Sequence, residues 1–457
     1  MIASLSLQHI AQACEGSLSG DDLLIKQVST DTRKIAQGDL FVALRGENFN
    51  AHDFLASAVA QGAVALVVES ENKQLNVPQI VVADTTQALG DIGRLARQQF
   101  EGTLVAITGS SGKTTVKEML ASIFREAGEV HATKGNLNNH IGVPLTLMAM
   151  ESNQGFAVIE MGASGLHEIG YLVSIGQPQI ALVNNAMAAH LEGFGSLQGV
   201  ANTKGEIYAG LQAGGTAVLN ADDQFYSQWR DSLRDDVKPL SFSVSSKADF
   251  SALNISQGEN GGPTFTLVTP AGEIDIQLQL LGAQNVANAL AASACAYAAG
   301  VELPQIQQGL QNLQAVAGRL SALTGASQAL IIDDSYNANP GSVRAAIDTL
   351  VSLKARDKTV LVLGDLGELG DSANDLMKEL GVYAKQAGVE QLITTGVISR
   401  FASEGFGEGS QHFEKQWDAI QQLQQQVDKN TVVLIKGSRS ARMDVVVQAL
   451  TQSGDKS

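Results

Sequence analysis

The sequence predicts an α/β protein with three domains. Short apolar runs alternate with helix-like stretches along most of the chain, which is typical of parallel sheets covered by helices. The 457 residues also exceed what one hydrophobic core usually holds, and about 150 residues per domain gives about three domains. We therefore expect a small α/β domain, a central domain with a mostly parallel sheet, and a second α/β domain at the C-terminus.

The first domain is predicted at residues 1–83. The runs "DLFVAL" and "AVALVV" are typical of short buried strands, and "AHDFLASAVAQG" lies between them with the spacing of a helix. The stretch "TTQALGDIGRLARQQF" then predicts one helix that leads into the strand "TLVAIT" at 103–108. We place the first boundary before that helix, near residue 84.

The central domain is predicted at 84–318. Strands such as "FAVIEMG" and "IALVNNA" alternate with helical segments, as in a parallel sheet. Residues 248–280 instead alternate apolar and polar residues between Gly and Pro turns, which favours antiparallel strands at one edge of this sheet.

The C-terminal domain is predicted at 319–457, after a hinge at 316–322. Its segments "TVLVLGDLGELG", "QLITTG" and "TVVLIKGS" are strand-to-loop transitions separated by helices. This pattern predicts a Rossmann-like, doubly wound sheet.

Composition excludes several classes of function. With 30 basic and 47 acidic side chains the net charge is −17, which repels a phosphodiester backbone, so we expect no nucleic-acid partner. Cys14 and Cys295 are far apart in the sequence, so we expect two reduced thiols and neither a disulfide framework nor a zinc site. The N-terminus lacks the features of a signal peptide, and no run of about 20 apolar residues occurs. We expect a cytoplasmic monomer with no membrane insertion.

The segment "TGSSGKTT" at 108–115 predicts a polyphosphate site. A strand, a Gly/Ser loop and a Lys-Thr pair that opens a helix would direct backbone N–H groups, the Lys113 ammonium and the Thr114 hydroxyl at phosphates and Mg²⁺. Gly109 and Gly112 enclose only Ser110 and Ser111, whereas the usual motif has four residues between its glycines. This spacing favours a particular branch of phosphate-loop enzymes over switch GTPases and motor ATPases. The alternative of a coincidental turn is less favoured, because a purely structural turn rarely needs Gly-Lys-Thr-Thr. The residues predicted to bind ATP here are Gly109, Ser110, Ser111, Gly112, Lys113, Thr114 and Thr115.

Three further side chains follow the predicted strands and helices of the central domain. Glu160 ends the strand "FAVIE", where it is either a Mg²⁺ ligand or a solvent-facing strand end. His190 follows the next strand as a candidate ligand or a packing histidine. Lys204 lies on a predicted helix, and taken alone it is a solvated lysine.

In their order and spacing these motifs resemble the Mur ligases, the ATP-dependent amide-forming enzymes of peptidoglycan precursor synthesis. The short loop, the "EMG" strand end, the His190 loop and the Lys204 helix all occur in the family's order. The resemblance extends over the whole chain and is strongest to the branch that adds D-alanyl-D-alanine. The segments that carry it are "STDTRKIAQGDLFVALRGENFNAHDF", "KGNLNNHIGVPLTL", "DDSYNANPGSVRAAI", "GDLGELG" and "KGSRSARMD".

The resemblance implies two Mg²⁺ ions. Thr114 and Glu160 would hold the ion that bridges the ATP β- and γ-phosphates, and Glu160 and His190 would hold the second. It also implies that Lys204 carries a carbamate formed from CO₂, which turns a cation into an anion able to support that metal. The implied catalytic residues are Lys113, Glu160, His190, Lys204, Arg319, Asp334 and Asn337.

The resemblance also assigns substrate-binding residues. Asn285 and Asn288 match an adenine-side motif in which the family often has His where Gln284 stands here. Arg319, Asp334 and Asn337 match positions through which the C-terminal domain closes on ATP, although Asn337 and Asn339 also suit a turn before Pro340. A uridine nucleotide would be received by Ser29, Asp31, Thr32, Arg33, Gly46 and His52. The D-alanyl-D-alanine carboxylate would be received by Lys436, Ser438 and Arg439.

The implied reaction joins D-alanyl-D-alanine to UDP-N-acetylmuramoyl-tripeptide through an acyl phosphate, with release of ADP and phosphate. The alternatives are the ligase that adds the third amino acid, a folylpolyglutamate synthetase, and a nucleotide-dependent switch that forms no bond. The segment "DDSYNANP" favours the dipeptide-adding enzyme, and a switch would not explain the Lys204 helix. The third residue of the tripeptide stays open, with meso-diaminopimelate as the expected one.

Overall fold

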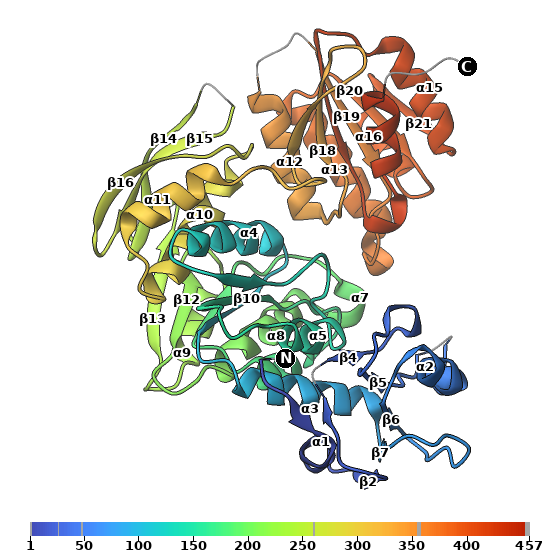
Figure 1. The fold of residues 1–457 in the computed structure, drawn as a ribbon. Helices are drawn as coiled ribbons and strands as arrows, with labels where there is room; N and C mark the ends of the chain where they lie inside the picture. The colour runs from blue at the N-terminus through green and yellow to red at the C-terminus, as the bar shows by residue number, and fades with distance from the viewer. Residues whose placement is uncertain (1, 26, 47–48, 259–260, 354–357, 453–457) are drawn as a thin grey trace.

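The computed structural model describes residues 2–25, 27–46, 49–258, 261–353 and 358–452. Their strands form four sheets of two, five, nine and six strands. Figure 1 shows the N-terminal elements in blue at one end of the molecule, the large central sheet beside them, and the C-terminal elements in orange and red at the other end. The predicted mixture of parallel-dominated α/β units is confirmed.

The N-terminal elements form a five-stranded sheet in the order β2-β7-β6-β5-β4, in which β2 alone is antiparallel to its neighbour. All four residues of β6 are buried, as expected for a parallel strand covered on both faces. The elements are β1 (Leu5–Ser6), α1 (Leu7–Ala13), β2 (Ser17–Ser19), β3 (Leu24–Ile25), β4 (Val28–Ser29), η1 (Thr32–Lys34), β5 (Leu40–Val42), η2 (Ala51–Phe54), α2 (Leu55–Gln61), β6 (Ala65–Val68) and β7 (Gln79–Val81).

Helix α3 (Thr85–Gln98) joins the N-terminal and central cores. Asp84 caps it by accepting hydrogen bonds from the N–H groups of Thr86 and Gln87, which explains why the helix begins there. Its buried residues, Leu89 among them, pack into the core of the five-stranded sheet. Arg97 near its other end donates to the Gly176 carbonyl of the central domain at 2.8 Å.

The central sheet has the order β16-β15-β14-β13-β12-β11-β8-β10-β9. Strands β9 to β14 are parallel, and β14, β15 and β16 form the antiparallel edge that the sequence predicts. The strands are β8 (Thr103–Thr108), β9 (Val130–Ala132), β10 (Phe156–Glu160), β11 (Ile180–Val183), β12 (Thr216–Asn220), β13 (Lys238–Ser243), β14 (Phe250–Gln257), β15 (Pro263–Thr269) and β16 (Gly272–Gln277).

Helices cover both faces of this sheet. One core contains α4 and α10 side chains such as Met119 and Leu290, and the other contains α6 and α8 side chains such as Leu172 and Ile207. The helices are α4 (Lys113–Arg125), α5 (Gly142–Met148), α6 (Glu168–Gly176), α7 (Leu191–Phe194), α8 (Leu197–Ala209), α9 (Tyr226–Asp231), α10 (Gln284–Ala298) and α11 (Leu303–Asn312).

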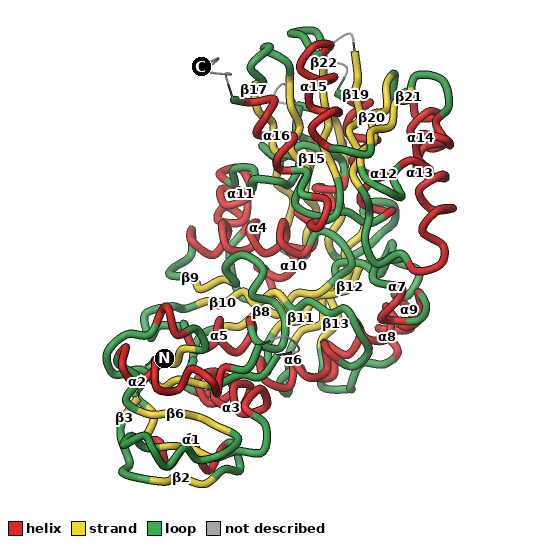
Figure 2. The backbone as a smooth tube through the Cα atoms, turned by 90° about the vertical axis from the view of Figure 1, so that its right-hand side faces the viewer, coloured by secondary structure: helices red, strands yellow, loops and turns green. Residues whose placement is uncertain are grey.

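The C-terminal sheet has the order β17-β18-β22-β19-β20-β21 and is parallel except for β17. Two separate cores lie on its opposite faces, which makes it the doubly wound sheet predicted from the sequence. Figure 2 shows helices on both sides of its strands. Its elements are β17 (Ser321–Thr324), β18 (Leu330–Asp334), α12 (Pro340–Ser352), β19 (Lys358–Gly364), η3 (Gly370–Ser372), α13 (Ala373–Ala387), β20 (Gln391–Thr395), α14 (Arg400–Phe406), β21 (Ser410–Phe413), α15 (Gln416–Gln426), β22 (Thr431–Lys436), η4 (Arg439–Ala441) and α16 (Asp444–Thr451).

The carboxyl ends of strands from two sheets meet at one place. β8, β10 and β11 of the central sheet and β18 and β22 of the C-terminal sheet all end beside the same cavity. In parallel α/β sheets this edge is where binding sites form. Among the described residues, no helix has the length and apolar character needed to cross a membrane.

Candidate active site

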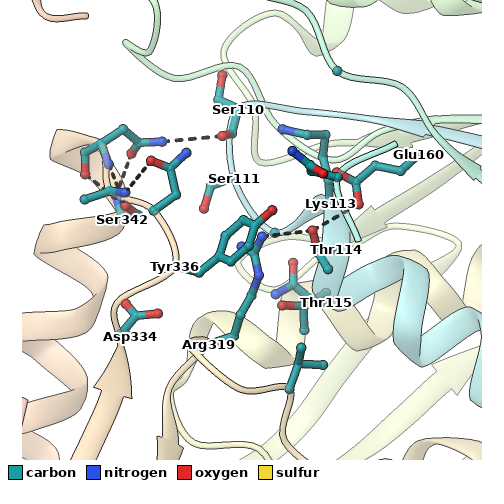
Figure 3. Close-up of a pocket in the computed structure, with 18 of the residues that line it drawn as sticks. Ser110, Ser111, Lys113, Thr114, Thr115, Glu160, Arg319, Asp334, Tyr336 and Ser342 are labelled. Carbon is teal, nitrogen blue, oxygen red and sulfur yellow. Dashed lines mark hydrogen bonds between the residues drawn. The ribbon is translucent and has the colours of Figure 1, made fainter. Parts of the chain in front are cut away.

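The central and C-terminal domains enclose a cavity of about 390 Å³. Figure 3 shows the loop of Ser110 and Lys113 on one side and Arg319, Tyr336 and Asp334 on the other. The predicted residues that line it are Ser110, Ser111, Gly112, Lys113, Thr114, Thr115, Glu160, His190, Asn285, Asn288, Arg319, Asp334, Asn337, Lys436 and Arg439.

Asparagine side chains hold the short loop after β8 in place. Asn185 Oδ1 accepts a hydrogen bond from the Ser111 N–H at 2.9 Å, and Asn184 Nδ2 donates to the Ser111 carbonyl at 3.0 Å. Gly112 has φ +78°, and a Cβ there would lie 2.5 Å from Asn184 Nδ2 and from Asn288 Oδ1. Only glycine suits this position, because it has no side chain and tolerates a left-handed backbone.

Lys113 opens helix α4 and donates from Nζ to the Gly109 carbonyl at 2.6 Å. Burial lowers the pKa of Lys113; the nearby Glu160 carboxylate raises it, and Arg319 from the C-terminal domain lowers it further. A cation that is desolvated and repelled by a second cation favours an anion beside it. The backbone N–H groups at the helix N-terminus are also electropositive, so they favour an anion at the same place.

Glu160 is 3% exposed, so the alternative of a solvent-facing strand end is wrong. Its carboxylate accepts hydrogen bonds from Thr114 Oγ1 at 3.0 Å and from Asn138 Nδ2 at 2.8 Å. Its backbone N–H donates to Thr133 Oγ1 at 2.9 Å. The carboxylate is therefore fixed beside the hydroxyl that opens the phosphate-loop helix.

His190 lies on the loop after β11, and Lys204 lies on α8. His190 Nδ1 is in direct contact with the Glu368 carboxylate of the C-terminal domain. Burial lowers the pKa of His190, while Glu368 raises it to a smaller extent.

Lys204 is 2% exposed, with Nζ 5.7 Å from the centre of the Phe194 ring, and it does not line the cavity. The interpretation of Lys204 as a solvated lysine is therefore wrong. Burial, followed by the charge of Lys113, holds the pKa of Lys204 well below its usual range.

The C-terminal domain places two guanidinium groups on one tyrosine ring. Arg319 lies 4.5 Å and Arg439 lies 5.7 Å from the ring centre of Tyr336. Arg319 also crosses the cavity and donates to Thr114 Oγ1 at 2.9 Å (Figure 3). This hydrogen bond connects the two domains directly at the phosphate loop.

Lys436 and Ser438, predicted to receive a peptide carboxylate, are occupied by contacts within the domain. Lys436 is 2% exposed and donates to Asp334 Oδ2 at 2.5 Å and to the Asn337 carbonyl at 2.9 Å. Burial raises the pKa of Asp334, and Lys436 partly offsets this. Ser438 Oγ donates to the Asp365 carbonyl at 2.8 Å and does not line the cavity.

The predicted adenine-side asparagines form a chain that reaches the phosphate loop. Asn288 Nδ2 donates to Asn285 Oδ1 at 2.8 Å, and Asn184 Nδ2 donates to Asn288 Oδ1 at 3.0 Å. Asn339 forms the turn before Pro340 and also contacts the central domain. It caps α12 by accepting from the Ser342 N–H, and its Nδ2 donates across the cavity to the Ser110 carbonyl at 3.4 Å.

The residues predicted to receive the uridine nucleotide lie in the N-terminal domain, away from this cavity. Asp31 forms a two-point pair with Arg33, which lowers the pKa of Asp31 to about 2. The ring of His52 lies between Asn50 Oδ1 and the Glu69 N–H, at 3.0 Å from each, and it lines a separate cavity of about 490 Å³. None of the six lines the main cavity: Ser29, Asp31, Thr32, Arg33, Gly46 and His52.

Sequence reasoning missed four side chains that organise this site: Thr133, Asn138, Tyr336 and Glu368. Asn138 and Tyr336 belong to segments already singled out, "KGNLNNH" and "DDSYNAN", so their polar and aromatic character is a usable signal. Glu368 also belongs to a quoted segment, "GDLGELG", but nothing in that segment indicates a contact with His190. Thr133 carries no local signal, because its partners lie on other elements.

In the described part of the chain, no three His, Cys, Asp or Glu side chains form a group that could hold a metal ion by themselves. The oxygens of Thr114 and Glu160, 3.0 Å apart, are the kind of donor that Mg²⁺ prefers. A metal here would need additional oxygens from a ligand or a modified side chain.

Comparisons with known proteins agree along the length of the chain. Three family models match: Mur ligase family, catalytic domain, at residues 24–97; Mur ligase middle domain at 107–296; and Mur ligase, glutamate ligase domain, at 318–439. The UDP-N-acetylmuramoyl-tripeptide–D-alanyl-D-alanine ligase of Escherichia coli K12 is 44% identical over 454 residues, which cover 99% of each chain.

Solved structures agree as well. A crystal structure of MurF from Acinetobacter baumannii matches with a TM-score of 0.92 at 36% identity, over 98% of both chains. MurF ligase from Thermotoga maritima in complex with ADP matches with a TM-score of 0.83 at 26% identity, over 93% of this chain and 96% of that one. The chain therefore belongs to the Mur ligase family, and within it to the MurF group.

Proposed function

We infer that this chain is an ATP-dependent ligase that joins D-alanyl-D-alanine to UDP-N-acetylmuramoyl-tripeptide. The observation that carries this is the cavity itself, in which a phosphate loop, a fixed carboxylate and two arginines from a second domain converge. The names of relatives up to 44% identical over nearly the whole chain supply the substrates, and the ADP complex supplies the nucleotide.

The chemistry requires an activated carboxyl group. A free carboxylate resists attack by an amine because oxide is a poor leaving group. Attack of the tripeptide carboxylate on the γ-phosphorus of ATP breaks the bond to the β-phosphate oxygen, giving an acyl phosphate and ADP. The dipeptide amine then attacks the acyl carbon, phosphate leaves, and the nitrogen loses a proton to give the amide.

The protein neutralises phosphate charge and aligns the substrates. Lys113 and the N-terminus of α4 face the phosphates from the central domain, and Arg319 faces them from the C-terminal domain. Thr114 and Glu160 would hold Mg²⁺ beside the nucleotide phosphates, because oxygens are the donors that this ion prefers. When bound, Mg²⁺ would supply charge stabilisation at the transferring phosphoryl group.

His190 and Lys204 are proposed to support a second Mg²⁺, with Lys204 as a carbamate. Carbamate formation needs an uncharged amine, which attacks CO₂ and releases one proton. The lowered pKa of Lys204 supplies that amine, because burial and Lys113 both disfavour its ammonium form. The product is an anion where an ammonium would repel a metal.

The remaining assignments concern the two peptide substrates. Arg439, which lines the cavity over Tyr336, is the residue of its loop best placed to receive the dipeptide carboxylate. The N-terminal domain, proposed as 1–83, would hold the uridine nucleotide, with 84–318 as the ATP-binding domain and 319–457 as the closing domain. We further propose a cytoplasmic monomer.

Steady-state phosphate release tests this function. We expect release to depend jointly on UDP-N-acetylmuramoyl-tripeptide and D-alanyl-D-alanine, with a pentapeptide product detected by mass spectrometry. Basal ATP hydrolysis that neither substrate changes would instead indicate a nucleotide switch. Comparing D-alanyl-D-alanine with free diaminopimelate and glutamate as amines separates the dipeptide ligase from related ligases, and tripeptides ending in diaminopimelate or lysine settle the third residue.

A further inference from the structure

Lys117 is a buried lysine outside the cavity, on the same helix as Lys113 and Thr114. It is 2% exposed and does not line the cavity. Lysine is almost never fully buried unless its ammonium is paired. The proposed reaction gives the Lys117 ammonium no role. Any function of Lys117 must therefore follow from the groups that it contacts.

Lys117 Nζ makes two contacts. It donates to the Thr133 carbonyl at 2.8 Å and lies 2.6 Å from Glu118 Oε1. Thr133 follows β9 and is itself 1% exposed. Lys117 therefore connects α4 to the residue that follows β9.

Thr133 connects this lysine to Glu160. The Thr133 N–H donates to the Val158 carbonyl at 3.0 Å, and Thr133 Oγ1 accepts from the Glu160 N–H at 2.9 Å. Thr133 is thus held at its N–H, its carbonyl and its hydroxyl. The chain Lys117, Thr133, Glu160 fixes the backbone from which the Glu160 carboxylate meets the Thr114 hydroxyl.

Lys117 also pairs with Glu118, which lines the cavity. The Glu118 side chain is 27% exposed, so water screens its charge from a bound phosphate. The contact through Thr133 is therefore the one by which Lys117 acts on Glu160.

We propose that Lys117 is a positioning residue, acting through Thr133, that sets the Glu160 carboxylate for a metal-bound nucleotide. Residues that orient a metal ligand without touching the metal typically change metal affinity by about 10- to 100-fold when removed. The inference rests on one part of the proposed function, namely that this cavity binds an adenine nucleotide together with a metal ion.

Binding of Mn²⁺ in the presence of ADP tests the proposal without either peptide substrate. Free Mn²⁺ is followed by its electron paramagnetic resonance signal, while ADP binding without metal is measured separately. Lys117→Met keeps the length and most of the volume of the side chain but removes its charge. We expect it to weaken Mn²⁺ binding about tenfold and to leave metal-free ADP binding within about twofold of wild type.

Two further variants identify the route. Lys117→Arg keeps a charged donor and should recover part of the Mn²⁺ affinity. Thr133→Val removes the hydroxyl at similar volume and should weaken Mn²⁺ binding to a similar degree. Both changes act on one chain of contacts, so their effects should not add. The double variant should bind Mn²⁺ about as tightly as the single variant with the lower Mn²⁺ affinity.

Arg97→Lys is the matched control. Arg97 is a buried cation, 3% exposed, that donates to the carbonyls of Gly176 and Phe100 and does not line the cavity. Its substitution should lower thermal stability and leave Mn²⁺ affinity unchanged, as expected of a purely structural cation.

Wild-type Mn²⁺ affinity in a folded Lys117→Met, or fully additive effects with Thr133→Val, would overturn the proposal. If Lys117→Met does not fold, Thr133→Val decides, and wild-type affinity there is the contrary result. Ligation by the wild type is a separate assay, so failure of the proposed function is distinguishable from failure of this inference.

Discussion

Removing Arg319 should separate the two domains at the phosphate loop. Its guanidinium donates to Thr114 Oγ1 at 2.9 Å and lies 4.5 Å from the Tyr336 ring centre. A charge-assisted hydrogen bond contributes about 1.5–3 kcal/mol and a cation–π contact about 0.5–2 kcal/mol. Because the side chain is partly exposed, we take the lower part of the sum, about 2–3 kcal/mol. At about 1.4 kcal/mol per factor of ten, Arg319→Ala should lower kcat/KM for ATP about 30- to 150-fold.

Two assays are needed, because a lower rate alone does not report closure. Phosphate release with both peptide substrates gives kcat/KM, and small-angle X-ray scattering with ADP gives the radius of gyration. We expect Arg319→Ala to remain more extended than the wild type when ADP is bound. Arg319→Lys keeps the charge but loses the planar fork, so it should recover only part of the rate.

Arg344 offers a matched control on the same domain. Its guanidinium lies 4.7 Å from the Tyr383 ring centre and 3.5 Å from Glu379 Oε2, and it does not line the cavity. Arg344→Ala therefore removes the same type of stacking at a site where closure should not depend on it. The reasoning is refuted if Arg319→Ala stays within about threefold of wild type and closes normally, or if both variants lose rate equally.

Three other results are expected. Lys204→Ala should lose turnover and recover part of it with added formate or acetate, and full activity without them would exclude the carbamate. Gly112→Ala should lower the free energy of unfolding by about 1–3 kcal/mol and weaken ADP binding, because its Cβ would lie 2.5 Å from Asn184 and Asn288. Gly155→Ala is the control, because a Cβ there meets no atom within 4 Å, and it should change neither quantity. Thermal unfolding measures the stability, and calorimetric titration measures ADP binding. Burial lowers the pKa of His131 below 6.5, so at acidic pH the folded state binds fewer protons than the unfolded state. The stability that the neutral imidazole allows is present above about pH 6.5, and it is lost as the pH falls through the folded-state pKa. His131→Gln should flatten that loss in urea titrations between about pH 7.5 and 5.5, and an equal slope in both proteins would contradict the assignment.

The sequence predicts the conformation of the loop at 109–115 well because its contacts are local. A strand, two glycines and Lys113 determine a loop at a helix N-terminus, whatever the rest of the fold does. The strand end at Glu160 follows from the same argument, since parallel strands bring their carboxyl ends to one edge. The sequence gives no reason, however, for Glu160 to meet Thr133 and Asn138, because pairing of β9 with β10 is not readable locally.

Contacts between residues far apart in the sequence were less predictable for the same physical reason. Lys436 resembles a free cation in a substrate loop, yet β22 lies beside β18 and pairs it with Asp334, 102 residues earlier. The contact of His190 with Glu368 likewise depends on how two sheets face each other. Sequence spacing places each side chain at the edge of a sheet. The strand order within a sheet and the packing of one sheet against the other decide which side chains meet.

The pairing of Lys436 with Asp334 also explains how the nucleotide can drive closure. Because Asp334 neutralises Lys436, the cations that the C-terminal domain presents to the cavity are mainly the guanidinium groups of Arg319 and Arg439. Arg319 lowers the pKa of Lys113, which means that the two cations repel each other when the domains meet. A polyphosphate between them would replace that repulsion with two attractions, although the protein as a whole carries a net charge of −17. Closure should therefore strengthen with the number of phosphates, from AMP to ADP to an ATP analogue, and weaken with added salt. Equal closure with AMP and with the ATP analogue would show that adenine contacts alone bring the domains together.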